Sequence, residues 1–403
     1  MMYMKKIELL APAGNLEKLK FAFMYGADAC YIGGRDYSLR ANAKNFSIQE
    51  IKEACNYAHS LNKKVYVTVN IVFHSEDTVG LVNYLKELSE AHVDAIIVSD
   101  PFIIDIINKN DINLKIHIST QASTLNYETV MFWKNLGVER VVLARELSRE
   151  EIKEIIDRTG MEVEIFVHGA MCSSYSGRCV LSNYFTNRDA NRGGCAQICR
   201  WEAPLYDSKM NLVESPIKFT ASSKDLMMAN CIEEIIGTGI ASLKVEGRMR
   251  SNYYVATVIN TYRNIIDDYY DNNLSREKLS RYIKILERVA NREATVQFWD
   301  KLPTVNEQYY LGRNEASNQD FLGIVTDYDE ESKIVTMTER NYFKTGDEVE
   351  IFGPNIETFS FVMPEIYNAE GEKVNIARHP EEILKFKLDK KVYQNDMIRV
   401  KIS

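Results

Sequence analysis

One pattern recurs through residues 1–250: a segment with helical spacing, a small or polar turn, and then a short apolar run. The apolar runs have the length of strands and are too short for buried helices. Apolar strands that alternate with helices are parallel and buried on both faces. The strands fall within residues 7–10, 26–32, 65–69, 92–98, 115–118, 137–143, 162–167 and 239–245. Eight such units predict a closed (β/α)8 barrel, a TIM-like fold.

The residues that follow each apolar run favour this barrel over an open, doubly wound sheet. Polar or small residues stand at 11–14, 33–35, 70, 99–100, 119–121, 145–146, 168–169 and 246–248. The carboxyl ends of barrel strands converge on one face, where active sites form. We expect these residues to meet there, with an insertion of about residues 169–241 lying over them.

The texture of the sequence changes after a helical stretch over residues 252–289. Short alternating strands are expected at 320–326, 333–338, 348–352, 358–363, 384–388 and 397–402. Strands at this spacing, separated by turn residues, indicate a small antiparallel barrel or sandwich. The sequence therefore predicts an α/β protein with a barrel at residues 1–290 and a small C-terminal antiparallel β-domain at 310–403.

Four of the seven cysteines lie close together in the chain, at Cys172, Cys179, Cys195 and Cys199. No apolar leader follows the first residues, and no apolar run approaches the roughly 20 residues that span a bilayer. We therefore expect a cytoplasmic protein that does not associate with a membrane. Thiols stay reduced in the cytoplasm, so clustered cysteines indicate metal or redox chemistry rather than disulfides.

The spacing of these cysteines leaves three chemistries and one structural role open. The pattern Cys-x6-Cys-x15-Cys-x3-Cys lacks the paired Cys-x2-Cys units of structural zinc sites. An iron–sulfur cluster also needs cysteine ligands but tolerates varied spacing. A cysteine nucleophile paired with His168 is the third chemistry. Inert packing of buried cysteines is the structural role.

The charge of the chain restricts its partners. A formal charge of −8 and a pI near 5.5 argue against indiscriminate binding of polyanions, because such binding depends on the phosphates that Lys and Arg neutralise. One local exception lies beside the cysteines, at Arg178, Arg188, Arg192 and Arg200. These arginines would contact phosphate or carboxylate groups, or they would belong to a solvated loop.

Several charged residues at the ends of the expected strands have two readings each. His168 would act as a general base or only form structural hydrogen bonds. Glu246 and Arg248 would bind or polarise a substrate, or they would pair with each other. Arg145 is ambiguous in the same way. Residues 119–121 would offer hydroxyl and amide groups to a ligand, although Ser and Thr also cap helices.

The strand and loop around the cysteines carry a longer motif, with Glu164, Phe166, Gly169, Cys172, Gly177, Cys179 and Ser182. Further motifs stand at residues 9–14, 26–33, 119–121, 144–147, 223–226 and 244–248. Together they resemble peptidase family U32, the collagenase-like proteases. The resemblance covers most of the chain.

The resemblance implies an enzyme that modifies RNA. The members most similar in pattern are implicated in prephenate-dependent hydroxylation of the tRNA wobble uridine to 5-hydroxyuridine, and several relatives carry a 4Fe-4S cluster. The chain contains neither a Ser-His-Asp signature nor a His-Glu-x2-His motif of familiar proteases. The alternatives are a collagenase-like peptidase with a cysteine-based site, and a noncatalytic subunit paired with a related family member.

The resemblance places the cluster on Cys172 and the next two cysteines, Cys179 and Cys195. Many relatives have a fourth cysteine directly after Lys-Asp-Leu, where this chain has Met227. Cys231 lies four residues further on and would share that face if the segment were a helix. We therefore favour Cys231 over the alternative, Cys199, as the fourth ligand.

The implied reaction would take place on the barrel face. Arg145 and Arg248 suit the carboxylates of prephenate as a possible co-substrate, and Glu246 or His168 would handle protons. A base that is modified must leave its stack, which is easier in a loop. Phosphate contacts to tRNA would come from Arg188, Arg192 and Arg200.

Overall fold

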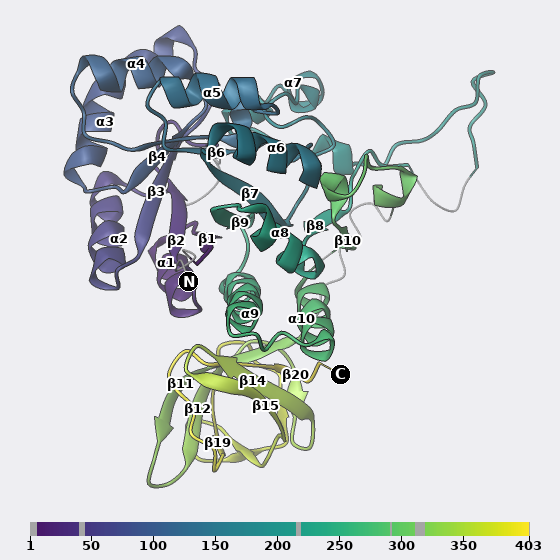
Figure 1. Cartoon of the computed structure of the whole chain (residues 1–403). Coiled ribbons are helices and arrows are strands. Elements are labelled where there is room, and N and C mark those ends of the chain that lie inside the picture. Colours follow the sequence, from purple (N-terminus) through teal and green to yellow (C-terminus); the bar gives the residue numbers. More distant parts are fainter. Residues whose placement is uncertain (1–5, 40–44, 215–218, 291, 311–318, 403) are drawn as a thin grey trace.

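The computed structural model describes residues 6–39, 45–214, 219–290, 292–310 and 319–402 (Figure 1). Its N-terminal part is a closed barrel of eight parallel strands: β1 (Glu8–Pro12), β2 (Ala29–Gly33), β3 (Lys64–Val69), β4 (Ala95–Val98), β5 (Ile116–Ile118), β6 (Arg140–Val142), β7 (Glu162–Gly169) and β9 (Ser242–Val245). The first seven pair in chain order, and β9 closes the ring between β7 and β1. The predicted (β/α)8 barrel is confirmed.

Helices cover the outside of the barrel: α1 (Leu16–Met24), α2 (Ile48–Ser60), α3 (Leu81–Glu90), α4 (Pro101–Lys109), α5 (Tyr127–Asn135), α6 (Arg149–Thr159), α8 (Ile232–Thr238) and α9 (Asn252–Tyr270). Their apolar faces pack against the strands in one continuous core. Local chemistry fixes where helices begin, because Ser47 and Ser148 form capping boxes with Glu50 and Glu151. None of the helices in the described ranges combines the length and the apolar character needed to cross a bilayer.

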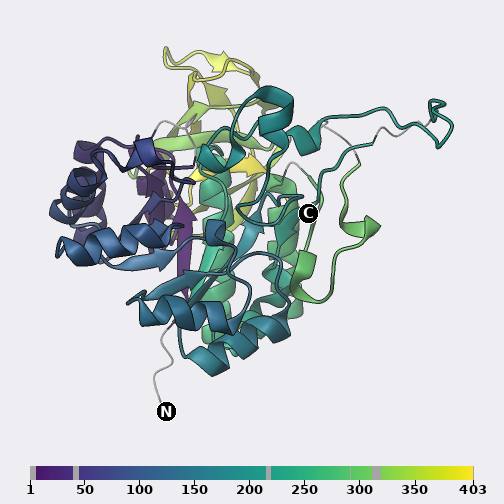
Figure 2. The same cartoon turned by 90° about the horizontal axis from the view of Figure 1, so that it is seen from above.

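The segment between β7 and β9 is more structured than a loop. It contains α7 (Leu181–Thr186), the 3-10 turns η3 (Ala190–Arg192), η4 (Ile198–Arg200) and η5 (Ala229–Cys231), and the strand β8 (Asp225–Met227). Between η4 and β8 an extended hairpin runs outward from the barrel (Figures 1 and 2), held by a 2.8 Å bond from Val213 N to Leu205 O. β8 returns to the barrel, pairing antiparallel with the end of β7 and parallel with β10 (Ala294–Thr295).

The expected helical stretch over residues 252–289 is two helices. α9 ends at Tyr270 and α10 runs over Arg276–Val289. Between them, Asn272 has a φ of 55°, a left-handed conformation that a helix cannot continue through. Ser275 then caps α10 by accepting a hydrogen bond from Lys278 N.

The C-terminal part is the predicted antiparallel β-domain, with its own apolar core. The six expected strands are β11 (Phe321–Asp329), β12 (Ile334–Glu339), β14 (Glu348–Gly353), β15 (Ile356–Val362), β19 (Ile383–Lys387) and β20 (Met397–Val400). Two-residue strands were not expected: β13 (Phe343–Lys344), β16 (Ile366–Tyr367), β17 (Lys373–Val374) and β18 (Ile376–Ala377). The main sheet has the order β15-β14-β20-β11-β12-β19-β16-β17, and β13 pairs with β18.

The β-domain packs beneath the barrel against α9 and α10 (Figure 1). The ring of Tyr253 on α9 stacks on Phe321, with 4.6 Å between the ring centres. Tyr25, which follows α1, donates a 2.6 Å hydrogen bond to the carbonyl oxygen of Asn395. Aromatic stacking and a buried hydrogen bond thus join the two parts.

Candidate active site

The carboxyl ends of the barrel strands surround a cavity of about 230 Å³. Residues of β2, β3, β4, β6, β7 and β9 form its inner part, and residues 175–199 of the insertion lie across it. Its charged lining consists of Arg145, Lys244, Glu246 and Arg248. The cavity therefore lies where active sites of (β/α)8 barrels form.

The structure brings all four clustered cysteines to this cavity. Cys172 follows β7 directly, whereas Cys179, Cys195 and Cys199 come from the insertion. All are free thiols. Surrounding protein raises the pKa of the Cys172 thiol even though part of its surface is accessible, and the neighbouring Arg145 opposes that rise. A bound cation or metal would favour the thiolate form.

An all-sulfur donor set of four thiols around one cavity fits an iron–sulfur cluster better than it fits a hard cation such as Mg²⁺ or Ca²⁺. The side chains do not converge on a common point. Within the ranges that the structure describes, no group of three or more His, Cys, Asp or Glu side chains is gathered closely enough to hold a metal ion. The four thiols would thus have to move closer together for a cluster to bind.

Cys231, the favoured fourth ligand, lies elsewhere. Cys231 would share a face with residue 227 only on a continuous helix after Lys-Asp-Leu. In the structure Met227 ends a strand, and Cys231 ends a 3-10 turn before α8. Its sulfur lies 3.6 Å from Asn230 Oδ1 within the apolar core. Burial raises its pKa to about 12. The fourth cysteine that the fold brings to the cavity is Cys199.

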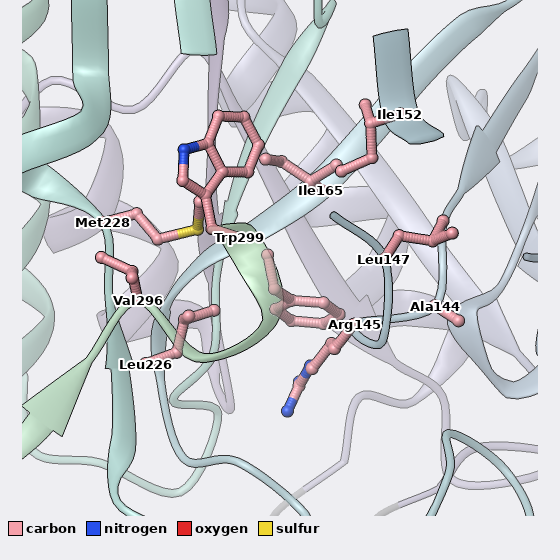
Figure 3. Close-up of a pocket in the computed structure, with 10 residues that line it drawn as sticks. Ala144, Arg145, Leu147, Ile152, Ile165, Leu226, Met228, Val296 and Trp299 are labelled. Atoms are coloured by element: carbon pink, nitrogen blue, oxygen red, sulfur yellow. The ribbon is translucent and has the colours of Figure 1, made fainter. Parts of the chain in front are cut away.

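Arg145 stands between the cysteines and the barrel wall. Its guanidinium lies over the ring of Phe166, 3.9 Å from the ring centre, and donates a 2.7 Å hydrogen bond to Ala170 O. Figure 3 shows it at the edge of a second pocket of about 30 Å³, which is otherwise apolar. Burial lowers the pKa of Arg145, and the charge of Glu246 opposes that shift. Arg145 is therefore a fixed cation directed at the cavity.

Arg248 follows β9 and extends past β1 to the segment after β2. Its Nη1 donates to Ser38 Oγ at 3.0 Å, and its Nη2 donates to Asn45 Oδ1 at 2.7 Å. A Cβ on Gly33 would overlap Arg248 Nη2, so any larger residue here would displace the guanidinium. Arg248 is held rigidly as a second cation of the cavity.

Glu246 supplies the carboxylate of the cavity, two residues before Arg248 on the same loop. Its backbone N–H donates a 2.9 Å hydrogen bond to His168 O. Gly169, with a φ of 109°, allows this close approach, because a Cβ there would lie 2.8 Å from Glu246 Cβ. The absence of a side chain at residue 169 thus lets the backbone of β7 lie directly against Glu246.

Lys244 is a further cation of the cavity, and the sequence alone did not single it out. Its Nζ lies 2.8 Å from Glu164 Oε1 and 4.4 Å from the ring centre of Tyr31. Glu164 is completely buried and also pairs with Arg140 at 3.1 Å. Burial lowers the pKa of Lys244, and Glu164 opposes that shift. The signal in the sequence is a lysine inside an apolar strand, because a lysine at a buried position is rare unless it is paired.

Asn70 and Ser119 complete the uncharged side of the cavity. Both follow strands, β3 and β5, and both are buried. Their position after apolar strands predicted that they would face the barrel mouth, but nothing in the sequence indicated that they touch each other. Asn70 Nδ2 donates to Ser119 Oγ at 3.0 Å.

His168 is not brought to the cavity. Strict alternation would place it on the same side of β7 as Phe166, but the pairing of β7 with β9 shifts register between these two residues. The imidazole packs instead against Tyr254 and Tyr262 of α9. Burial, with a contribution from Arg250, lowers its pKa to about 3. Among the described residues that line the cavity, none is a histidine.

The three arginines expected to bind phosphate have different environments. Arg192 pairs with Asp77 and donates a 2.7 Å hydrogen bond to Val72 O, which ties η3 to the loop after β3. Arg200 donates to Gln197 Oε1 at 3.0 Å. Arg188 is exposed. Of the three, Arg192 is therefore engaged within the protein and Arg188 is the one at the surface.

The chain is similar over most of its length to two proteins named for tRNA hydroxylation. The chain is 48% identical over 400 residues to tRNA hydroxylation protein P1 of Bacillus subtilis, covering 98% of this chain and 95% of that protein. It is 35% identical over 426 residues to tRNA hydroxylation protein P of Escherichia coli, covering 93% and 92%. It is also 36% identical over 263 residues to the 23S rRNA 5-hydroxycytidine C2501 synthase of Escherichia coli, covering 65% of this chain and 39% of that protein.

Two family models divide the chain at the same place as the fold. The model of peptidase family U32 matches residues 14–309, which include the cysteine insertion and all of the barrel strands except β1. The model of the peptidase family U32 C-terminal domain matches residues 317–399, which include the antiparallel sheet. The chain belongs to peptidase family U32.

Proposed function

We propose that this protein is a tRNA-modifying enzyme that hydroxylates the wobble uridine to 5-hydroxyuridine, with prephenate as co-substrate and an iron–sulfur cluster as cofactor. Two similar full-length relatives are named for tRNA hydroxylation, and a third for forming a hydroxylated pyrimidine in rRNA. The observation that carries the proposal is that four thiols and three cations line one cavity at the catalytic face of the barrel.

The ligands of the cluster in this proposal are Cys172, Cys179, Cys195 and Cys199, because these four share the cavity. When bound, a 4Fe-4S cluster supplies electron-transfer or Lewis-acid chemistry. Arg145 lies beside Cys172, so its positive charge would favour the thiolate that binds the cluster.

Prephenate would be bound through its two carboxylates. Arg145 and Arg248 reach the cavity from different sides, after β6 and after β9. Guanidinium groups bind carboxylates through paired hydrogen bonds. Two separated, rigid cations therefore suit a small molecule with two acid groups.

The residue proposed to move a proton is Glu246. Replacement of the C5 hydrogen of uracil by a hydroxyl group is a two-electron oxidation, in which the prephenate co-substrate would give up its hydroxyl oxygen and take the electron pair. The proton released from C5 would pass to the Glu246 carboxylate, which lines the same cavity. The wobble base lies in a loop and reaches the cavity without opening a duplex. Arg188 and Arg200 would contact the tRNA backbone.

A cysteine peptidase is not favoured by this geometry. Such an enzyme needs a base beside its thiol, and His168 lies behind β7. A tRNA substrate implies that the protein acts in the cytoplasm. Pairing with a related family member is the second arrangement that we propose to test.

Nucleoside analysis of tRNA tests the function. Deletion of the gene should remove 5-hydroxyuridine and its derivatives, and wild-type protein, but not Glu246→Gln, should restore them. The comparison is repeated in cells with and without any related family gene. Unchanged 5-hydroxyuridine in every deletion strain would refute the proposal, and loss only in the double deletion would show shared function with the relative.

A further inference from the structure

One buried acceptor at the cavity has no partner among the residues that the structure describes. Asn70 is 8% exposed and lines the cavity after β3. Its Nδ2 donates a 3.0 Å hydrogen bond to Ser119 Oγ. Its Oδ1 is buried and has no hydrogen-bond partner among the described residues. Because buried polar atoms are almost always paired in folded proteins, this oxygen indicates a ligand group.

Ser119 adds a donor beside that acceptor. It is 2% exposed and lines the same cavity. Its Oγ accepts from Asn70 Nδ2 and, at 3.2 Å, from Gln121 N. These two bonds use the acceptor capacity of the hydroxyl, so its hydrogen is left to donate. Asn70 and Ser119 therefore present one acceptor and one donor side by side.

Neighbouring side chains do not satisfy this pair. Thr68, two residues before Asn70, also lines the cavity. Its hydroxyl donates to Ile32 O at 3.1 Å and contacts Ser38 Oγ at 2.8 Å. The cations are engaged elsewhere, since Arg248 binds Ser38 and Lys244 binds Glu164. Among the described residues no group satisfies Asn70 Oδ1, which leaves it open to a bound molecule.

The chemistry of the pair selects the kind of ligand. Carboxylate and phosphate groups at neutral pH offer mainly acceptors, so they match Arg145 and Arg248 and would be repelled by Asn70 Oδ1. A pyrimidine edge instead carries a donor beside an acceptor. In uracil the donor is N3–H and the acceptor is the adjacent carbonyl oxygen.

We propose that Asn70 and Ser119 bind the N3–H and an adjacent carbonyl of a uracil base that enters the cavity. This inference rests on the proposed function and identifies the base-reading residues of the same site. Because C5 of the base must reach the reacting centre, any pyrimidine that reacts would lie in the cavity in the same orientation. Cytosine in that position would turn its N3 acceptor toward the Asn70 acceptor. The pair therefore distinguishes uracil from cytosine.

RNA binding by the full-length protein tests this inference without requiring turnover. Anticodon stem-loop RNAs would carry uridine, N3-methyluridine or 2′-O-methyluridine at the wobble position, and their dissociation constants would be measured by fluorescence anisotropy. Wild-type protein should bind the uridine hairpin at least about tenfold more tightly than the N3-methyl hairpin, because a buried hydrogen bond is lost. It should bind the 2′-O-methyl hairpin about as well as the uridine hairpin.

Variants separate hydrogen bonding from simple crowding by the methyl group. Asn70→Ala and Ser119→Ala should each reduce the preference for uridine over N3-methyluridine to within about threefold. Asn264→Ala is the matched control, because Asn264 bonds to Asn260 on α9, away from the cavity, and should keep the wild-type preference. Circular dichroism and thermal melting would establish that each variant is folded.

The outcomes distinguish this inference from the proposed function. Equal binding of uridine and N3-methyluridine hairpins by wild-type protein would overturn base reading while leaving tRNA binding intact. An undiminished preference in both alanine variants, or a preference that follows 2′-O-methylation instead, would overturn it as well. Failure to bind any of the hairpins would refute the proposed function, and this inference with it.

Discussion

A side chain at the end of a barrel strand reaches the cavity only if the strand keeps its alternation up to that point. On β7, Glu164 and Phe166 point into the barrel, where Glu164 holds Lys244 and Phe166 supports Arg145. The register of β7 against β9 shifts between Phe166 and His168, and His168 faces α9. A single register shift thus decides which residues can take part in the chemistry.

Substitution of His168 by Phe should leave tRNA hydroxylation within about twofold of wild type, because the imidazole lies behind the cavity. The substitution should also make the unfolding free energy less dependent on pH in the acid range. The pKa of His168 is lowered to about 3 in the folded protein, below the ordinary 6.5. Between these values the unfolded chain binds a proton that the folded protein excludes, so stability is lost as pH falls.

Urea unfolding of wild type and His168→Phe at pH 7.5 and pH 5.0 measures this effect. The wild-type protein should lose more unfolding free energy between the two pH values than the variant does. An equal loss in both proteins would contradict the placement of His168, and so would a tenfold fall in hydroxylation by the variant.

Gly33→Ala should disable the site through Arg248. The added Cβ overlaps the Arg248 guanidinium, and overpacking of this kind costs about 1–3 kcal/mol. We expect a lower melting temperature and loss of most tRNA hydroxylation. Gly237→Ala is the control, because nothing lies within 4 Å of the added carbon there. Wild-type activity of Gly33→Ala would show that Arg248 need not occupy its observed position.

At the scale of elements, the insertion depends on the barrel for its position. Arg192 joins η3 to Asp77 in the loop after β3, and Val72 N donates a 2.9 Å hydrogen bond to Asn191 O. Three of the four cavity cysteines lie on this insertion, so their approach to Cys172 depends on such ties.

Asp77→Asn should loosen the insertion without unfolding the barrel, because it removes the charge that faces Arg192. Hydrogen–deuterium exchange should rise in residues 188–199 and stay unchanged in β2 to β5. Asp105→Asn, which removes an exposed i,i+4 pair on α4, is the control. Unchanged exchange over residues 188–199 in Asp77→Asn would show that the insertion is held by other contacts.

The sequence predicts an element when the element is long enough to show a regular pattern of apolar residues. The eight buried barrel strands are marked by continuous apolar runs and the six strands of the β-domain by alternating apolar and polar residues, and all fourteen occur in the structure. β8 and the two-residue strands are too short to show a period, and the break at Asn272 depends on one backbone angle. Cys231 and His168 were misplaced because the sequence shows neither the strand at Met227 nor the register shift of β7.

At the scale of the molecule, the β-domain packs on helices of the barrel through aromatic contacts. Tyr253→Ala should lower the unfolding free energy by about 2 kcal/mol, because it removes the stack on Phe321. Tyr184→Ala, at an exposed position on α7, should change it by less than about 0.5 kcal/mol. Equal effects of the two variants in chemical denaturation would contradict the observed packing between the domains.

The proposed cluster site depends on which four cysteines act together at the barrel face. The most direct measurement is the iron and sulfide content, with the visible spectrum, of wild-type, Cys199→Ala and Cys231→Ala proteins purified without oxygen. We expect about four irons per chain in wild type and Cys231→Ala, and loss of iron and colour in Cys199→Ala. Colourless wild-type protein, or loss in Cys231→Ala with retention in Cys199→Ala, would contradict it.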